Sequence, residues 1–296
     1  MANRQHMLIG VIILSSIIFF IFAMALLISS LNKGSNSIAS SGGDKVAIVK
    51  VEGVIYGSES IVDQLDKYKR DKSVKAIVLR VNSPGGGIAP SQEMYEKVKE
   101  VRDSGKPVVA SMGSVAASGG YYVSCGADTI MANPGTTTGS IGVIAEIPNT
   151  QKLMDLIGIK YEVIKSGKYK DTGSPHREMT PDERAYLQGW INDAYEQFVD
   201  VVANERKLDR QTVKKYADGR VYTGKQALKI GLIDTLGTYE DAIHLAAKIG
   251  GIDEENPKTI QDRRRKLTIW DVLFQDVSKL ADLIQRWPRM KYQLAY

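Results

Sequence analysis

Short apolar runs rich in β-branched residues alternate with helical patterns through the middle of this chain. Amphipathic stretches such as residues 91–101 lie between runs at residues 46–55, 75–81, 107–112, 128–133 and 160–165. Strands that are apolar along most of their length are typical of parallel sheets covered by helices on both faces. The alternation therefore predicts an α/β domain with buried, largely parallel strands.

Three helices after this region carry clear start signals. Each is preceded by a threonine whose hydroxyl can cap the first turn, at Thr180, Thr223 and Thr238. The first of these also has proline at its first position and glutamate at its third, and the pattern predicts a helix to about residue 205. Glycines near residues 231 and 250 end the other two. These signals place the folded domain at residues 46–250.

The N-terminal region has the composition of a membrane anchor. Met7–Leu31 is a run of 25 residues without a charged side chain, which is long enough to span a bilayer as a helix. A cleavable signal peptide ending near Ala23-Met24-Ala25 is the alternative, but the apolar run continues past that point. We expect residues 1–6 in the cytoplasm, a single span at 7–31 in the cell membrane, a flexible linker at 32–45 and an extracytoplasmic domain.

Charge and cysteine content narrow the functional classes only slightly. The net charge of +5 comes from 39 basic and 34 acidic residues, and no basic stripe interleaved with aromatic residues marks the domain, so no nucleic-acid partner is expected. The single cysteine, Cys125, cannot form an internal disulfide. It is expected to be a small buried packing residue.

Two glycine-rich stretches are candidates for a site. The first, VNSPGGGIAPS at residues 81–91, follows a predicted strand and can direct main-chain N–H groups at a ligand. It has neither the dinucleotide nor the phosphate-loop spacing, and a tight turn is the alternative interpretation. The second, GSVAASGGYYVSCGA at residues 113–127, puts Ser118 at the turn into a short helix, where the Gly119 N–H can face an oxyanion. Its alternative is an ordinary helix-capping serine.

A nucleophilic serine requires a base, and the sequence leaves two possibilities. His6 precedes the apolar run and His244 lies in a predicted helix, so a histidine base would have to be His176. Lysine can also serve when burial lowers its pKa toward neutrality. Lys165, Lys168 and Lys170 follow the last predicted strand, and spacing alone does not choose among them.

Five motifs in order resemble the signal peptide peptidase A family of membrane-anchored serine proteases. They are NSPGGG, GSVAASGGYYVS, TTTGSIGVI, SGKYKDTGSPHREMT and DGRVYTGKQALKIGLID, within residues 46–250. The resemblance implies a Clp protease and crotonase-like fold of repeated β-β-α turns. It also implies that Ser118 is the nucleophile, Lys170 the general base and Ser140 the residue that orients the lysine. Gly86 and Gly119 would then supply the oxyanion hole.

The resemblance implies an endopeptidase that degrades remnant signal peptides with a Ser-Lys dyad. Such a reaction requires no metal and no cofactor, and the short members of the family resemble enzymes whose sites are completed in ring-shaped homo-oligomers. Two alternatives stay open. One is an acyl-CoA enzyme of the crotonase type, which also uses glycine N–H donors, and the other is a catalytically inert scaffold with the same fold.

The segment 251–296 carries a helix and a tail. Between Thr268 and Trp287 the apolar residues recur every three or four positions, which predicts an amphipathic helix. It would pack on its own domain or a neighbouring subunit, or lie in a membrane interface, as two tryptophans and a basic cluster at residues 263–266 suggest. The final residues, RWPRMKYQLAY, form either a disordered terminus or a peptide-like segment that enters the active groove.

Overall fold

The computed structural model describes residues 43–262 and the backbone of 291–293. The predicted anchor at 7–31, most of the linker and the predicted helix at 268–287 lie outside the described residues. Among the described residues, no helix combines the length and apolar character that a membrane crossing requires.

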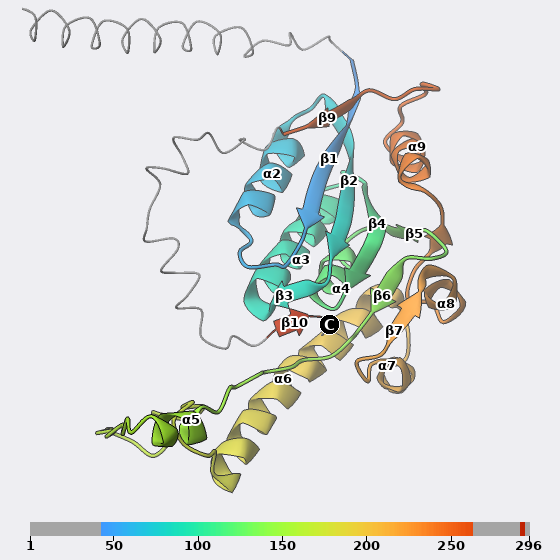
Figure 1. Cartoon of the computed structure of the whole chain (residues 1–296). Helices are drawn as coiled ribbons and strands as arrows, with labels where there is room; N and C mark the ends of the chain where they lie inside the picture. The colour runs from blue at the N-terminus through green and yellow to red at the C-terminus, as the bar shows by residue number, and fades with distance from the viewer. Residues whose placement is uncertain (1–42, 263–290, 294–296) are drawn as a thin grey trace, which may run out of the picture. The chain divides into compact units, whose positions relative to one another are not determined.

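A mostly parallel sheet forms the centre of the domain (Figure 1). Its strands run in the order β7-β6-β4-β2-β1-β9, β5 also pairs with β4, and β8 pairs with β5. In this sheet only the β6–β7 pair is antiparallel. The strands are β1 (Lys45–Glu52), β2 (Val74–Ser83), β4 (Val108–Ala117), β5 (Thr129–Ala132), β6 (Thr137–Gly139), β7 (Val221–Thr223), β8 (Thr235–Leu236) and β9 (Thr259–Gln261). The predicted α/β class is confirmed.

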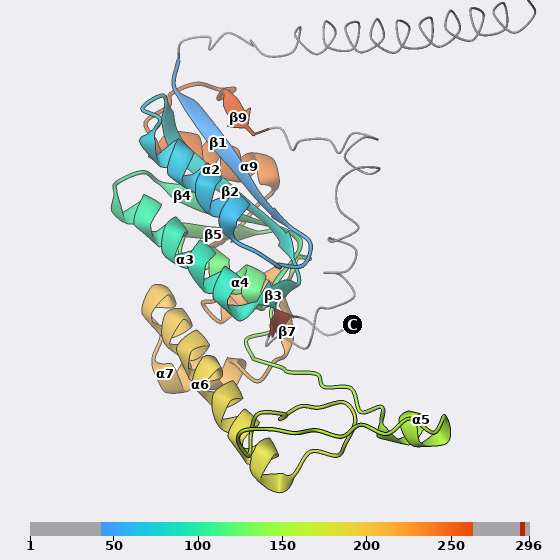
Figure 2. The same cartoon turned by 90° about the vertical axis from the view of Figure 1, so that its left-hand side faces the viewer.

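Helices cover both faces of this sheet, as Figures 1 and 2 show. They are α2 (Glu59–Arg70), α3 (Ile88–Asp103), α4 (Gly119–Ser124), α5 (Gln151–Leu156), α6 (Pro181–Arg206), α7 (Arg210–Tyr216), α8 (Gly224–Lys229) and α9 (Tyr239–Ile249). Alternate residues of β1 take part in two cores: Val46 and Ile48 pack with α9, whereas Ala47 and Val49 belong to the core under α2, α3 and α4. Because both faces are buried, the strands read as continuous apolar runs.

The three predicted helix starts are confirmed by capping boxes at Thr180, Thr223 and Thr238. In each, the threonine hydroxyl accepts from the N–H three residues on, and that residue's side chain accepts from the threonine N–H. These bonds satisfy donors that would otherwise have no partner in the first turn.

Three aromatic rings join the helices beneath the sheet. The ring of Tyr122 on α4 packs edge-on against Tyr95 of α3 and Phe198 of α6, with centroids 5.3 and 4.9 Å away. Edge-to-face pairs of this kind add to the stability that burial supplies. The second half of α6 is therefore fixed to the domain beside α4.

The first half of α6 and the segment before it project from the domain. We call residues 146–193 the arm; Figures 1 and 2 show α5 and the start of α6 apart from the sheet in both views. Within the arm, only Glu183 is buried. The prediction of a strand at residues 160–165 is wrong, because these residues form no strand and are exposed. Their β-branched pattern has no neighbouring strand in the described chain to pair with.

Candidate active site

Ser118 lies at the sharp turn between β4 and α4, as the sequence predicts. Its backbone has φ 52° and ψ −118°, a combination that L-residues rarely adopt. The residue is 1% exposed, and its Oγ has no hydrogen-bond partner among the residues that the structure describes. Because the hydroxyl does not bond to the first turn of α4, its interpretation as an ordinary cap is wrong. The turn instead holds a buried, unused hydroxyl.

Ser140 occupies the corresponding position on the next strand. Strands β4 and β6 run parallel with Ala117 opposite Gly139, so Ser118 and Ser140 each directly follow a paired residue. Neighbouring strands lie about 4.8 Å apart. Ser140 is 7% exposed and has φ 50°, and its N–H donates to the carbonyl of Arg220 over 2.9 Å. The two serines therefore lie side by side at the carboxyl ends of two neighbouring strands.

The glycines of the first loop form the short strand β3 (Gly85–Gly87) against Ile55. The Ile55 N–H donates to the Gly85 carbonyl over 2.9 Å, and the Gly87 N–H donates to the Ile55 carbonyl over 2.8 Å. A Cβ on Gly86 would lie 2.1 Å from that carbonyl oxygen, so only glycine fits. Since successive residues of a strand direct their polar groups to opposite edges, those of Gly86 face away from Ile55.

The two glycine-rich stretches meet where α4 begins. A Cβ on Gly120 would come 2.8 Å from the carbonyl oxygen of Ser83, and the Ser83 hydroxyl accepts from the Gly85 N–H over 3.1 Å. Helix α4 thereby contacts β3. Gly119 is the first residue of α4, so its N–H has no acceptor within the helix. The structure thus brings Gly86, Gly119 and Ser118 into one region.

The open edge of β3 pairs with a segment close to the end of the chain. The backbone of β10 (Lys291–Gln293) runs antiparallel to β3, with Tyr292 opposite Gly86. This is the geometry of strand addition, in which an extended peptide bonds to an exposed strand edge. Of the two interpretations of the tail, the peptide-like one describes residues 291–293.

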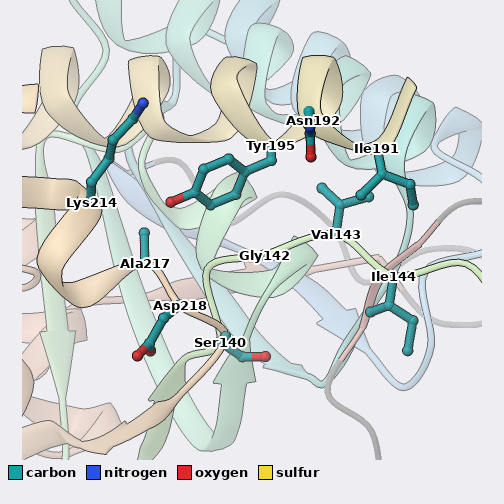
Figure 3. Close-up of a pocket in the computed structure, with 11 residues that line it drawn as sticks. Ser140, Gly142, Val143, Ile144, Ile191, Asn192, Tyr195, Lys214, Ala217 and Asp218 are labelled. Atoms are coloured by element: carbon teal, nitrogen blue, oxygen red, sulfur yellow. The ribbon is translucent and has the colours of Figure 1, made fainter. Parts of the chain in front are cut away.

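A pocket of about 560 Å³ opens beside Ser140 (Figure 3). Helix α6 supplies one side of it and the loop after β6 the other, with α7 and the following turn closing it. Both charged side chains of the lining have partners, since Lys214 bonds to Glu196 and Asp218 to Arg220. The lining residues are Ser140, Gly142, Val143, Ile144, Ile191, Asn192, Tyr195, Lys214, Ala217, Asp218 and Gly219.

Lys170 lies on the arm and is exposed. Arg177, seven residues after Lys170, bonds to Glu183 at the start of α6, whereas Phe198, 15 residues after Glu183, contacts α4. A helix rises 1.5 Å per residue, so these two points are about 22 Å apart. Within one chain Lys170 and Ser118 are not in contact, and the Ser118 Oγ has no partner among the described residues.

The three lysines of the arm turn differ in their partners. Lys165 pairs with Asp171 and Lys168 with Asp182, so both positive charges are matched by carboxylates. For Lys170, by contrast, the structure gives no ion pair within the described part of the chain. Of these three lysines, Lys170 is therefore the one whose amine is not paired with a carboxylate in the described part of the chain.

The remaining candidate groups lie away from Ser118. His176 stacks on Tyr161 of the arm, with centroids 3.6 Å apart, and His244 is exposed on α9. Cys125 is buried, and desolvation by burial raises the pKa of its thiol to about 12, as suits a packing residue. Within residues 43–262, no group of three or more His, Cys, Asp or Glu side chains is arranged to hold a metal ion.

Three residues of this region, Ile55, Ile191 and Tyr195, were not predicted from the sequence. Ile55 holds β3 through its backbone, which leaves no trace in its residue type. Tyr195 and Ile191, which line the pocket, are spaced by four residues on α6 and thus share one helix face. That spacing was a usable signal, but it does not reveal which surface the face meets.

Comparisons with known proteins agree with the geometry. The model of peptidase family S49 matches residues 100–253, and that of Clp protease matches residues 46–138. The chain is 42% identical over 257 residues to "Putative protease slr0021" of Synechocystis sp., covering 85% of this chain and 92% of that protein. It is also 42% identical to "Putative signal peptide peptidase SppA" of Enterococcus faecium, covering 64% of this chain and 55% of that protein. "Protease 4" of Salmonella typhi is 35% identical, covering 74% of this chain and 37% of that protein.

Proposed function

This chain belongs to peptidase family S49, and we propose that it is a serine endopeptidase whose catalytic dyad combines Ser118 of one copy with Lys170 of a second. The family resemblance drawn from the motifs is confirmed. The dyad, the assembly and the substrate are the proposal, and each is supported by different features.

The buried, unpartnered hydroxyl of Ser118 is the observation that carries the proposal. A buried polar atom normally has a hydrogen-bond partner, and leaving one without costs about 1–3 kcal/mol. The cost is understandable if the hydroxyl meets its partner only when the site is complete. Its strained turn beside two glycine backbones suits a nucleophile that attacks a carbonyl held by N–H donors.

The chemistry follows from these groups. Burial of the Lys170 amine against the second copy would favour its neutral form. That amine takes the Ser118 proton, and Oγ forms a bond to the peptide carbonyl carbon while the N–H groups of Gly86 and Gly119 stabilise the oxyanion. The lysine returns the proton to the leaving amine, and an acyl-enzyme remains. Water, deprotonated by the same lysine, then releases the acid and restores Ser118. Ser140, beside Ser118, would hold the lysine amine by a hydrogen bond.

A second copy is proposed because the arm separates Lys170 from the Ser118 of its own chain. The arm also exposes many large apolar side chains, among them Leu156 (83% exposed) and Ile164 (101%). Apolar surface of this extent marks an interaction site. If each arm reaches the next copy in the same way and the rotation between copies closes, the contacts form a ring with a site at every junction.

The proposed substrate is an extended, apolar peptide. The pairing of β10 with β3 shows that this strand edge accepts an antiparallel segment opposite Gly86. The pocket beside Ser140 contains Val143, Ile144 and Ile191, which suit an apolar side chain. With an uncleaved anchor at residues 7–31 the enzyme would act at the outer face of the membrane, where remnant signal peptides are a source of such segments.

Complementation tests the proposal directly. Ser118→Ala and Lys170→Ala should each abolish cleavage of apolar fluorogenic peptides while circular dichroism stays unchanged. Co-expressed in equal amounts, the two variants should recover about a quarter of wild-type activity, since a quarter of the junctions pair an intact Ser118 with an intact Lys170. Cleavage by Ser118→Ala alone would exclude the serine. Failure of the mixture to recover would exclude a site shared between copies.

A further inference from the structure

Hydrogen bonds from one residue, Arg177, hold the turn that carries Lys170. All five N–H groups of Arg177 donate to oxygen atoms. Nε donates to the Asp171 carboxylate over 2.9 Å and Nη1 to the Glu183 carboxylate over 2.8 Å. Nη1 also donates to the Glu178 carbonyl over 3.0 Å, and Nη2 to the Asp171 carbonyl over 3.2 Å and to the other Glu183 oxygen. Asp171 directly follows Lys170.

We call Arg177 and its two carboxylate partners, Asp171 and Glu183, the clasp. Its Glu183 end lies in helix α6. Glu183, 2% exposed, is the third residue of α6 and closes its capping box by accepting from the Thr180 N–H over 2.9 Å. Hydrogen bonds from Arg177 and Thr180 hold the pKa of Glu183 at about 2, so the carboxylate is ionised at neutral pH. The arginine therefore links a rigid helix start to the residue beside Lys170.

The clasp leaves the amine of Lys170 outside it. Lys165 also bonds to Asp171, and Lys168 bonds to Asp182, so the neighbouring lysines help to fix the turn. Such a network fixes the backbone on both sides of Lys170 without occupying its side chain. This arrangement suits a lysine that must reach a target outside its own chain.

We propose that Arg177 is a positioning residue, which through Asp171 and Glu183 sets the direction in which Lys170 is presented to the Ser118 of a second copy. The inference rests on the proposed function. It adds that the lysine's reach depends on a guanidinium 7 positions later in the sequence, a residue that touches neither substrate nor nucleophile. Only arginine offers the planar set of donors that both carboxylates and two carbonyls require.

Arg177→Met in the full chain should lower kcat by about 100-fold, because a misplacement of about 1 Å in a catalytic group has an effect of that size. KM should change little, since β3 lies outside the arm and the two arm residues that line the pocket, Ile191 and Asn192, are not among the hydrogen-bond partners of Arg177. Arg177→Lys, which keeps the charge and loses the planar donors, should restore only part of kcat. The matched control is Arg184→Met, which removes a charge from an exposed arginine one residue past Glu183 and should leave kcat unchanged.

Mixing experiments separate positioning from a general structural role. Arg177→Met should complement Ser118→Ala, because the Ser118→Ala copies supply an intact arm to intact serines. It should not complement Lys170→Ala, because both arms are then defective. Complementation of neither variant would mean that Arg177 supports folding or assembly, and complementation of both, or wild-type kcat in Arg177→Met, would mean that Lys170 does not depend on it. Any of these last three results would overturn the inference.

The same experiments distinguish the inference from the proposed function. If Ser118→Ala and Lys170→Ala do not complement each other, the site shared between copies is wrong. The clasp is then judged from kcat of Arg177→Met and its partial rescue in Arg177→Lys. If those two variants do complement each other while Arg177→Met behaves like Arg184→Met, the proposed function stands and the clasp has no part in it.

Discussion

The N–H of Ser118 donates to the carbonyl oxygen of Gly139 over 2.7 Å, so the turn that holds the candidate nucleophile is bonded to the residue directly before Ser140. A second bond ties the same strands together, from the Thr138 hydroxyl to the Ala116 carbonyl over 2.7 Å. The relative position of the two serines is therefore fixed by the sheet itself. It does not depend on the arm or on a second copy.

Gly86→Ala should reduce kcat by at least about 100-fold, the usual effect of removing one oxyanion donor. The added Cβ would lie 2.1 Å from the Ile55 carbonyl oxygen, and β3 would have to move. Gly135→Ala is the matched control, because nothing lies within 4 Å of a Cβ there and Gly135 does not have a positive φ. Peptide cleavage assays and circular dichroism of both variants make the comparison. Equal activity of the two would argue against a role for the Gly86 backbone.

Leu156→Glu and Ile164→Glu should weaken self-association without destabilising the fold. Both side chains are exposed in the single chain, so their replacement should change the free energy of unfolding by no more than about 0.5 kcal/mol. A charge placed in an apolar interface is unfavourable, so sedimentation velocity should show smaller assemblies and peptide cleavage should fall in parallel. Lys160→Glu, an exposed change of charge on the same segment, is the control. Unchanged assemblies in both variants would place the interface elsewhere.

The arm should become more mobile in acid. Bonds from Arg177 lower the pKa of Glu183 to about 2, and bonds from Arg177 and Lys165 lower that of Asp171. A carboxylate whose folded pKa is lowered stabilises the structure above its unfolded pKa, about 4.3 for glutamate and 3.9 for aspartate, and loses that contribution as pH falls through the folded value. Hydrogen exchange of residues 167–183, corrected for intrinsic rates, should be constant down to about pH 5 and faster between about pH 4 and 2.

Glu183→Gln provides the comparison for that measurement. The amide keeps the shape but not the charge, so protection of the arm should be lower at neutral pH and should depend less on acid than in the wild type. An identical acid profile in the two proteins would show that Glu183 is not the responsible group.

Removal of the terminal segment should change access to β3. A chain ending at Met290 lacks β10 and leaves the strand edge free, so KM for apolar peptides should fall if β10 occupies the substrate path. A chain ending at Gln293 keeps β10 and serves as the control. Identical KM values would mean that substrates do not bind along this edge.

Much of the fold was predictable because it follows from local rules. The buried strands have apolar runs, and the threonine caps at Thr180, Thr223 and Thr238 lie before helices whose starts they announce. The error at 160–165 shows the limit of such rules. A β-branched pattern favours an extended chain, but a strand also requires a neighbour, and none is specified by the segment itself.

The site was predictable only in part for a related reason. The turn at Ser118 and the glycines follow from residues close together in the sequence. The distance between Ser118 and Lys170 is set by the length of α6 and by the side on which its second half packs, which are properties of the whole domain. Arg177 likewise bonds to Asp171, six positions before it, and to Glu183, six positions after it. These bonds depend on a bend of the chain that no local sequence pattern predicts.

Ser118 and Ser140 both have φ angles near 50°, a conformation that glycine adopts without strain and serine does not. Each position therefore costs the folded protein about 1 kcal/mol or more. Glycine at either position would be expected to raise the melting temperature while removing a hydroxyl that the proposed chemistry requires. The active protein is then not the most thermally stable protein that this backbone can support, and a search for heat-resistant variants would be drawn toward inactive ones.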